Sequence, residues 1–209
     1  MNRPGKIVCV GRNYRDHAKE MGNDVPREPL LFLKPSSCVV ATGTPIELPA
    51  DAGRIDFEGE IGVVIGRTLR HADEQEAAGA IGGILAANDV SARDWQKNDG
   101  QWARAKGCDT FLPVSEAVPP PPVFSEITVV TRHNGVEKQR AKASDMVFAI
   151  PFLLSYISRY MTLDPGDLLL TGTPAGVAQI APGDTVEVEL LGLNAVCQVK
   201  IPVAAGPLG

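Results

Sequence analysis

Short runs of apolar, often β-branched residues recur along the chain, and glycine- and proline-rich turns separate them. Such runs are typical of strands, in which successive side chains point to opposite faces. They predict strands at 6–10, 30–33, 57–66, 82–89, 126–132, 136–141, 168–171, 185–191 and 195–201. The letters HNG at 133–135 predict a hairpin turn between two of these strands.

Few segments show the pattern of a helix. Residues 73–80 carry acids in the first turn, which suits the helix dipole, and residues 150–161 place Pro151 where a helix can begin. A third, short helix is expected after Ser91, a residue type favoured as an N-cap. The pattern therefore predicts a mainly β (α+β) protein, which is a sandwich, roll or barrel with a few short packing helices.

Composition adds limits to this picture. The 209 residues predict a single domain over 1–209, with a flexible tail at 203–209, and 44% hydrophobic residues are ordinary for a soluble globular protein. The net charge of −5 argues against nucleic acid and anionic membranes as partners, and no apolar run approaches the length of a membrane span. Four scattered cysteines without a CxxC pair favour reduced thiols in a cytoplasmic protein over a disulfide framework or a zinc site.

The stretch RIDFEGEIGVVIG at 54–66 carries the first candidate chemistry. Its odd positions are apolar or glycine, whereas Asp56, Glu58 and Glu60 occupy even positions. Carboxylates two residues apart on a strand lie about 7 Å apart on one face, from which they can converge on a divalent cation. Asp89, in LAANDVSARDW, ends a predicted strand and offers a third oxygen ligand. These carboxylates predict a site for a hard cation such as Mg²⁺, Mn²⁺ or Ca²⁺.

Another interpretation is that the alternating acids form the solvent-exposed face of the strand, and the pattern alone favours it. Gly62 and Gly66 continue the same face, however, and glycine there leaves space that can mark the close approach of a ligand. Asp56 can instead stabilise the turn after Arg54.

The segment GRNYRDHAKEMGND at 11–24 contains a candidate general base. If the segment is helical, His17 and Glu20 lie three residues apart on one face. The carboxylate would then orient the imidazole and raise its basicity, as activation of water requires. Gly11 and Gly22 bracket the segment, so we expect it to move as a lid. The alternative on these residues alone is a surface helix with an incidental pair.

Cationic and hydroxyl side chains complete the candidate site. Arg93 and Gln96 follow Asp89 at helical spacing and could hold an anionic substrate, and Lys106 lies in a short loop. Thr173 belongs to the letters TGTPAG, a loop whose hydroxyl and backbone N–H groups suit a carboxylate. The plain alternatives are a surface salt bridge for Arg93, a solvated loop for Lys106 and turn chemistry for Thr173.

Taken together, these pieces resemble the fumarylacetoacetate hydrolase family, above all its short single-domain branch of acylpyruvate hydrolases and oxaloacetate decarboxylases. The resemblance rests on GRNYRDHAKEM, EPLLFLKPSS, FEGEIGVVIG, NDVSARDWQ, AKGCDTFLPV, MVFAIPFLLSYIS and GDLLLTGTPAGV, which follow in this order from residue 7 to about 200. It implies a fold centred on a mixed β-roll, as in the catalytic domain of that family, and a homodimer.

The resemblance also implies roles for individual residues. The family's metal ligands, which bind Mg²⁺ or Mn²⁺ and can hold Ca²⁺ in a crystal, fall on Glu58, Glu60 and Asp89. Its catalytic groups fall on His17, Glu20 and Lys106. Its positions that face the substrate fall on Arg12, Arg93, Gln96 and Thr173. Larger relatives have a further metal-ligating Asp just ahead of the lid, where this chain has Cys9 and Val10, so we expect water in place of that ligand.

The activity implied is the metal-dependent cleavage of the C–C bond of acylpyruvates, such as fumarylpyruvate and acetylpyruvate, to pyruvate and a carboxylic acid. His17, assisted by Glu20, would take a proton from water, and Lys106 would stabilise the oxyanion. Decarboxylation of oxaloacetate and hydration or isomerisation of 2-oxo acids are alternatives at the same site. An alternative of another class is a non-catalytic module that binds a metal ion or a carboxylate.

Overall fold

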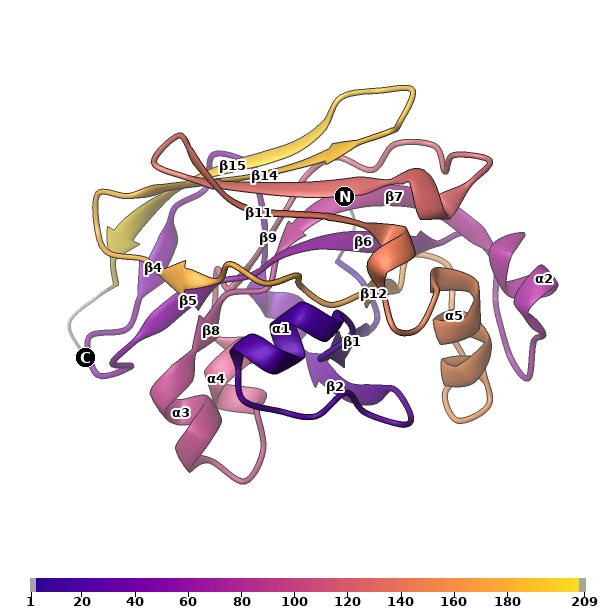
Figure 1. The fold of residues 1–209 in the computed structure, drawn as a ribbon, viewed down its shortest axis with the longest axis horizontal. Coiled ribbons are helices and arrows are strands. Elements are labelled where there is room, and N and C mark those ends of the chain that lie inside the picture. Colours follow the sequence, from indigo (N-terminus) through magenta and orange to yellow (C-terminus); the bar gives the residue numbers. More distant parts are fainter. Residues whose placement is uncertain (1–2, 207–209) are drawn as a thin grey trace.

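Two β-sheets pack face to face in the computed structural model of the chain, which describes residues 3–206 (Figure 1). In this part of the chain the larger sheet has seven strands in the order β2-β1-β12-β6-β7-β9-β3. Its strands are β1 (Ile7–Gly11), β2 (Leu30–Lys34), β3 (Val39–Ala41), β6 (Gly59–Ile65), β7 (Ile81–Asn88), β9 (Leu112–Val114) and β12 (Leu168–Leu170). The sheet is mixed, because β1 pairs with β12 and β3 with β9 in parallel, whereas β6 and β7 are antiparallel.

The second sheet has the order β11-β10-β14-β15-β4 and covers one face of β6 and β7. Its strands are β4 (Ile46–Leu48), β10 (Thr128–His133), β11 (Val136–Lys142), β14 (Thr185–Leu191) and β15 (Cys197–Ala205). A small third sheet joins β5 (Ile55–Phe57), β8 (Ser91–Ala92) and β13 (Ala178–Gln179). The mainly β fold predicted from the sequence is therefore confirmed.

Burial follows from this layering. Along β14, Val186, Val188 and Leu190 are buried and the residues between them are partly exposed, because this strand has one face on the core and one toward water. Nearly every residue of β7 is buried, which explains its uninterrupted run of apolar residues.

Five α-helices accompany the sheets in the described part of the chain. They are α1 (Arg15–Glu20), α2 (Glu74–Ala78), α3 (Arg93–Asn98), α4 (Ala103–Gly107) and α5 (Ile150–Ser158), and short 3-10 turns occur at Ser36–Cys38, Phe124–Glu126 and Ala143–Asp145. Asp73 caps α2 in a capping box with Glu76, and α2 packs on α5. No helix within residues 3–206 combines the length and the hydropathy needed to cross a membrane.

Several predicted boundaries are wrong. Ser91 does not cap α3: it belongs to β8 and donates its hydroxyl to the Asp89 carbonyl at 2.9 Å, while Ala92 precedes the helix. The strand predicted at 57–66 is two strands, because the chain passes from the small sheet to the large one at Glu58. The tail expected over 203–209 overlaps β15, whose Val203 to Ala205 pair with β4, and 207–209 lie outside the described residues.

Other predictions are confirmed. The hairpin turn at 133–135 joins β10 and β11, and Asn134 and Gly135 have the positive φ angles (51° and 80°) that such a turn requires. All four cysteines are free thiols, and Cys108 is the one that is not buried.

Candidate active site

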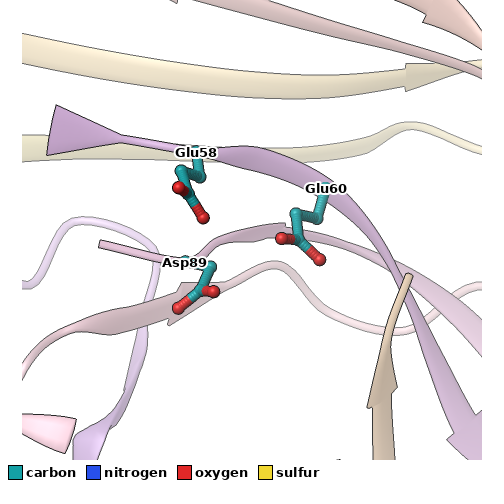
Figure 2. Close-up of side chains that lie close together, drawn as sticks. All are labelled: Glu58, Glu60 and Asp89. Carbon is teal, nitrogen blue, oxygen red and sulfur yellow. The ribbon is translucent and has the colours of Figure 1, made fainter. Parts of the chain in front are cut away.

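Three carboxylates converge at the point where β5, β6 and β7 meet. Glu58 lies between β5 and β6, Glu60 is the second residue of β6, and Asp89 directly follows β7. Each offers an oxygen within 4.8 Å of the others. Figure 2 shows Glu58, from the connection before β6, and Glu60, from β6, on the side of Asp89.

Backbone pairing fixes this arrangement. The Asp89 N–H donates to the Glu58 carbonyl at 2.8 Å, and the Glu58 N–H donates to Asn88 Oδ1 at 2.9 Å. Gly59 pairs with Asn88 and Glu60 with Ala87 in the β6–β7 register. The antiparallel register therefore brings residues that are 29 to 31 positions apart in sequence to one place.

The acids of this strand are not its solvent-exposed face. Asp56, Glu58 and Glu60 are 1%, 4% and 3% exposed, and Asp89 is fully buried. The interpretation of the pattern as a solvated strand face is therefore wrong. Buried carboxylates are costly unless cations or hydrogen bonds compensate them, so their partners decide what the site can do.

Two lysines hold Asp89 from opposite sides. Lys34, the last residue of β2, donates to Asp89 Oδ1 at 2.6 Å and to the Phe111 carbonyl at 3.0 Å. Lys106, on α4, donates to Asp89 Oδ2 and to Glu58 Oε2, both at 2.6 Å. Both lysines are buried, so the interpretation of Lys106 as a solvated loop residue is wrong.

These pairings fix charge states. Although burial disfavours the ammonium, Asp89 and Glu58 raise the pKa of Lys106 above its ordinary value. Burial likewise favours neutral Glu58, but Lys106 and Arg93 outweigh it and lower the pKa of this carboxyl. Lys106 therefore stays a hydrogen-bond donor and is unsuited to act as a base.

Arg93 forms ion pairs with both Asp56 and Glu58. Its Nη2 lies 2.7 Å from Glu58 Oε1, its Nε donates to Asp56 Oδ2 at 2.8 Å, and its Nη1 donates to Gln96 Oε1 at 2.8 Å. Arg54 binds the other side of Asp56 through two hydrogen bonds. Asp56 thus does more than stabilise the turn after Arg54, because it also orients Arg93.

Glu60 differs from the other two acids of the cluster. Within residues 3–206 it forms no ion pair, and its Oε2 accepts one hydrogen bond, from the Gly172 N–H at 2.7 Å. Burial raises the pKa of Glu60 well above its ordinary value, and the charges of Asp89 and Glu58 raise it further. A buried carboxylate without a cation, beside two others that supply only oxygen ligands, fits a hard divalent cation.

The loop after β12 packs against this cluster. Thr173 Oγ1 donates to the Gly59 carbonyl at 2.9 Å and accepts from Gln139 Nε2 at 2.8 Å. Gln139, on β11, also donates to the Pro174 carbonyl and accepts from the Gly59 N–H. The loop amides at Gly172 and Gly176 bind the protein's own Glu60 and Glu20, so the predicted carboxylate-binding loop serves internal carboxylates.

The predicted base is a buried residue of the predicted lid helix. His17, on α1, is 7% exposed, and its Nδ1 lies 3.3 Å from Glu20 Oε2. Glu20 in turn accepts from the Gly176 N–H at 3.1 and 3.2 Å. Asn13 anchors the start of this segment through hydrogen bonds to the carbonyls of Thr171 and Phe148. The imidazole is therefore enclosed although Glu20 is exposed, and the catalytic role of the pair stays a prediction.

One cavity of about 520 Å³ contains most of the predicted site. It is lined by Glu58, Glu60, Asp89, His17, Lys106, Arg12, Arg93, Gln96 and Thr173, together with Phe32, Trp102 and a rim that contains Arg54 and Lys97. Glu20 does not line the cavity and reaches it only through His17. Carboxylates for a cation, an enclosed imidazole and a buried ammonium can together polarise a carbonyl group, move a proton and stabilise an oxyanion.

Some predictions about the site's surroundings fail. Gly62 does not leave space for a ligand, because a Cβ there would overlap the Leu85 side chain, and Gly66 abuts Gly82. Cys9 lies fully buried in β1, and the expectation of water in place of a further ligand there stays a prediction. Sequence reasoning missed Lys34, whose signal was a lysine that ends the apolar run LLFLK.

Comparisons with known proteins agree with this geometry. A family model described as fumarylacetoacetate hydrolase C-terminal matches residues 6–200. A mitochondrial oxaloacetate decarboxylase from Dictyostelium discoideum is 40% identical over 203 residues, which are 94% of this chain and 93% of that protein.

Two solved structures share the fold and differ in their reactions. A 5-carboxymethyl-2-hydroxymuconate delta-isomerase from Mycobacterium smegmatis superposes with a TM-score of 0.89 at 41% identity, covering 98% of this chain and 80% of that one. A fumarylpyruvate hydrolase from Pseudomonas aeruginosa, solved with Mn²⁺ and pyruvate, gives a TM-score of 0.89 at 28% identity, covering 97% and 90%.

Proposed function

The chain belongs to the fumarylacetoacetate hydrolase family, and we propose that it hydrolyses the C–C bond of acylpyruvates to pyruvate and a carboxylic acid. The observation that carries this proposal is the enclosed His17, which lines the same cavity as Glu58, Glu60 and Asp89. Hydrolysis needs a group that activates water next to the groups that bind the 2-oxo acid, and the cavity contains both.

The metal would be held by Glu58, Glu60 and Asp89, and Mg²⁺ or Mn²⁺ suits their oxygen atoms. When bound, it would supply Lewis-acid polarisation of the 2-oxo group. The Mn²⁺ in the fumarylpyruvate hydrolase structure supports this choice.

His17, Glu20 and Lys106 have separate roles in the proton transfers and in stabilising the oxyanion. His17 takes a proton from water, and the water oxygen bonds to the distal carbonyl carbon. Glu20, 3.3 Å from Nδ1, orients the ring so that the other nitrogen faces the cavity. Lys106 donates a hydrogen bond to the oxyanion. When the C–C bond breaks, the electron pair passes to the pyruvate fragment, which then accepts a proton from His17.

A second candidate is the decarboxylation of oxaloacetate, which the 40% identical decarboxylase supports. Loss of CO₂ requires polarisation of the 2-oxo group but no activated water. His17 therefore distinguishes the two reactions. Isomerisation of a 2-oxo acid, the reaction named for the Mycobacterium smegmatis relative, would need a base but no water.

The test follows the enol absorbance of acetylpyruvate with and without Mn²⁺, in the wild-type protein and in His17→Ala. We expect metal-dependent loss of the band, a decrease of about 10²–10⁴-fold in His17→Ala, and unchanged Mn²⁺ affinity in this variant. A His17→Ala enzyme with the full hydrolytic rate would contradict the role of this residue.

The same assay addresses the other candidates. Turnover of oxaloacetate alone, insensitive to His17→Ala, would favour the decarboxylase. No turnover of either compound, together with tight oxalate binding, would favour a non-catalytic module. The homodimer and the cytoplasmic location stay predictions from the sequence.

A further inference from the structure

A buried glutamine outside the cavity contacts both segments that carry the metal site. Gln139, on β11, is 1% exposed and does not line the cavity. It is the one buried residue of β11, and its neighbours along the strand are exposed or partly exposed. A buried side-chain amide is costly unless it forms hydrogen bonds, so the partners of Gln139 show what it does in this position.

Two backbone partners fix the orientation of the Gln139 amide. Its Oε1 accepts from the Gly59 N–H at 3.0 Å, and its Nε2 donates to the Pro174 carbonyl at 2.8 Å. A backbone N–H can only donate and a carbonyl can only accept, so the reversed amide would lose both bonds. The second hydrogen of Nε2 therefore goes to Thr173 Oγ1, at 2.8 Å, and the Thr173 hydroxyl donates to the Gly59 carbonyl at 2.9 Å.

These two side chains take the place of a strand beside Gly59. On one side Gly59 pairs with β7, and on the other side β12 pairs with β6 only as far as Gly62. Buried N–H and C=O groups need partners. Gln139 supplies one for the Gly59 N–H, and Thr173 supplies one for its carbonyl.

The hydrogen bonds of Gly59 act on the acids on both sides of it. Its N–H belongs to the peptide unit shared with Glu58, and its carbonyl belongs to the unit shared with Glu60. The orientations of these two units set the directions in which the two carboxylates leave the strand. A side chain cannot hold the backbone here, because a Cβ at Gly59 would overlap Thr131 Oγ1. The orientation of the two acids therefore depends on the hydrogen bonds.

The loop at 172–176, which receives two of the Gln139 hydrogen bonds, contacts two further carboxylates. The Gly172 N–H donates to Glu60 Oε2 at 2.7 Å, and the Gly176 N–H donates to Glu20 at 3.1 and 3.2 Å. A Cβ at Gly176 would overlap a backbone carbonyl of β11, so the loop packs directly on that strand. Glu60 is thus held from its own backbone and from this loop, and both depend on the same amide.

We propose that Gln139 is a positioning residue for the metal site, whose amide holds Gly59 and the loop with Thr173 in one arrangement. Gln139 does not contact the cavity and takes no part in bond cleavage. The inference rests on the metal site of the proposed function and is independent of the reaction that follows. The hydrogen bonds of a side chain outside the cavity then determine how tightly Glu58 and Glu60 hold a divalent cation.

Calorimetric titration with Mn²⁺ tests this inference in the wild-type protein and in Gln139→Met. Methionine is unbranched and close to glutamine in length, but it cannot replace these hydrogen bonds. We expect Mn²⁺ binding to weaken by about 10–100-fold, the range for loss of groups that hold metal ligands in place. Wild-type Mn²⁺ affinity in Gln139→Met would overturn the inference.

A double variant tests the connection through the loop. Thr173→Val removes the hydroxyl that links the Gln139 amide to the Gly59 carbonyl. If the two residues act together, Gln139→Met combined with Thr173→Val should lose less Mn²⁺ affinity than the product of the two single losses. A loss equal to that product would mean that they act independently, and would contradict the arrangement proposed here.

Two controls separate positioning from loss of stability. Thr131→Val changes a buried residue beside Gly59 whose hydroxyl has no hydrogen-bond partner within residues 3–206, and it should leave Mn²⁺ affinity unchanged. Leu153→Ala changes a fully buried residue of α5 that does not line the cavity, and it should lower Tm without changing Mn²⁺ affinity. Equal losses of affinity in Leu153→Ala and Gln139→Met would overturn the inference, because destabilisation alone would then explain both.

Gln139→Asn decides the matter if Gln139→Met does not fold. It keeps the amide on a side chain that is one methylene shorter, so it cannot reach all of the same partners. We expect Mn²⁺ binding to weaken several-fold in this variant, and wild-type affinity would overturn the inference.

Failure of the proposed function gives a different result. A protein whose Mn²⁺ affinity depends on Gln139, but which leaves acetylpyruvate and fumarylpyruvate intact, would refute hydrolysis and support the positioning role. Metal-dependent hydrolysis with the same kcat and the same Mn²⁺ affinity in the wild-type protein and in Gln139→Met would do the reverse.

Discussion

Glu58, Glu60 and Asp89 have the same functional group, but their neighbours give them different properties. Both oxygens of Asp89 are bound to lysines, and Glu58 lies between Lys106 and Arg93. Within residues 3–206, Glu60 accepts a single side-chain hydrogen bond, from a backbone amide. The acid with the fewest compensating partners gains most from a bound cation, so Glu60 is the residue through which metal binding is best tested.

We expect Glu60→Gln to weaken Mn²⁺ binding by about 100-fold or more, since loss of outer-shell partners alone costs about 10–100-fold. The stability of the metal-free protein should change by only about 1 kcal/mol, because glutamine can still accept from the Gly172 amide. Calorimetry and urea unfolding measure the two quantities.

Asp89→Asn is the contrasting variant. It leaves Lys34 and Lys106 buried beside a neutral group, so stability should fall by about 3–5 kcal/mol. An Asp89→Asn protein as stable as Glu60→Gln would contradict the charge pairing described here.

For single residues, the sequence indicates which side chains belong to the site better than it indicates which side chains they contact. The spacing of Glu58 and Glu60 was visible because two positions on one strand share a face. Lys34 was not identified, because its partner Asp89 lies 55 positions away and only the sheet brings them together. Gln139 is a similar case, since its contacts with Gly59 and Thr173 join three segments.

Among the elements, α1 is held to the rest of the fold by side-chain hydrogen bonds at both ends. It has six residues, too few to be stable as an isolated helix. Asn13 anchors its start, and Glu20 binds its end to the Gly176 amide. Release of the Glu20 contact would therefore free one end while the other stays attached, which is the behaviour of the lid that we propose for residues 11–24.

Glu20→Ala tests this lid. We expect faster amide hydrogen exchange across residues 15–20 and slower hydrolysis, because His17 loses the carboxylate that orients it. The free energy of unfolding should change by only about 1 kcal/mol, since one partly exposed hydrogen-bonding group is lost. Lys19→Ala, a neighbouring exposed residue, is the control. Unchanged exchange in Glu20→Ala would argue against a latch at this position.

Strands with several alternating or consecutive apolar residues were predictable from the sequence, and the two-residue strands were not. The strand predicted at 185–191 coincides with β14, because its alternation spans seven residues. Strands β8 and β13 have two residues each, too few for any periodic pattern, and exist because β5 pairs with both. The break at Glu58 was hidden for a related reason: the alternation continues through the point where the chain changes sheets.

For the whole molecule, the buried acids couple metal binding to folding. The cluster brings together β6, the segment after β7, the end of β2 and α4, so a cation bound there stabilises contacts among all of them. The unfolded chain cannot present these groups together, so the cation binds the folded state selectively.

Mn²⁺ at about 100 times its Kd should stabilise the fold by about 2.7 kcal/mol. For a chain of 209 residues this corresponds to a rise in Tm of about 5–10 °C, which EDTA should reverse. Differential scanning calorimetry of the wild-type protein and Glu60→Gln measures the effect, which should fall to about 0.4 kcal/mol or less in the variant. A Tm that ignores Mn²⁺ in the wild-type protein would count against the metal site.

Gln139 supports the walls of the cavity although it does not line the cavity itself. No residue of β10 or β11 between positions 128 and 142 lines the cavity, yet the Gln139 amide joins Gly59 of the metal-binding strand to the loop with Thr173. A graft that copied only the lining side chains onto another scaffold would leave this brace behind. The segments on which the site depends therefore extend beyond the residues that line the cavity. We expect a chimera of two relatives to keep an intact site when the β10–β11 hairpin and β6 come from the same parent.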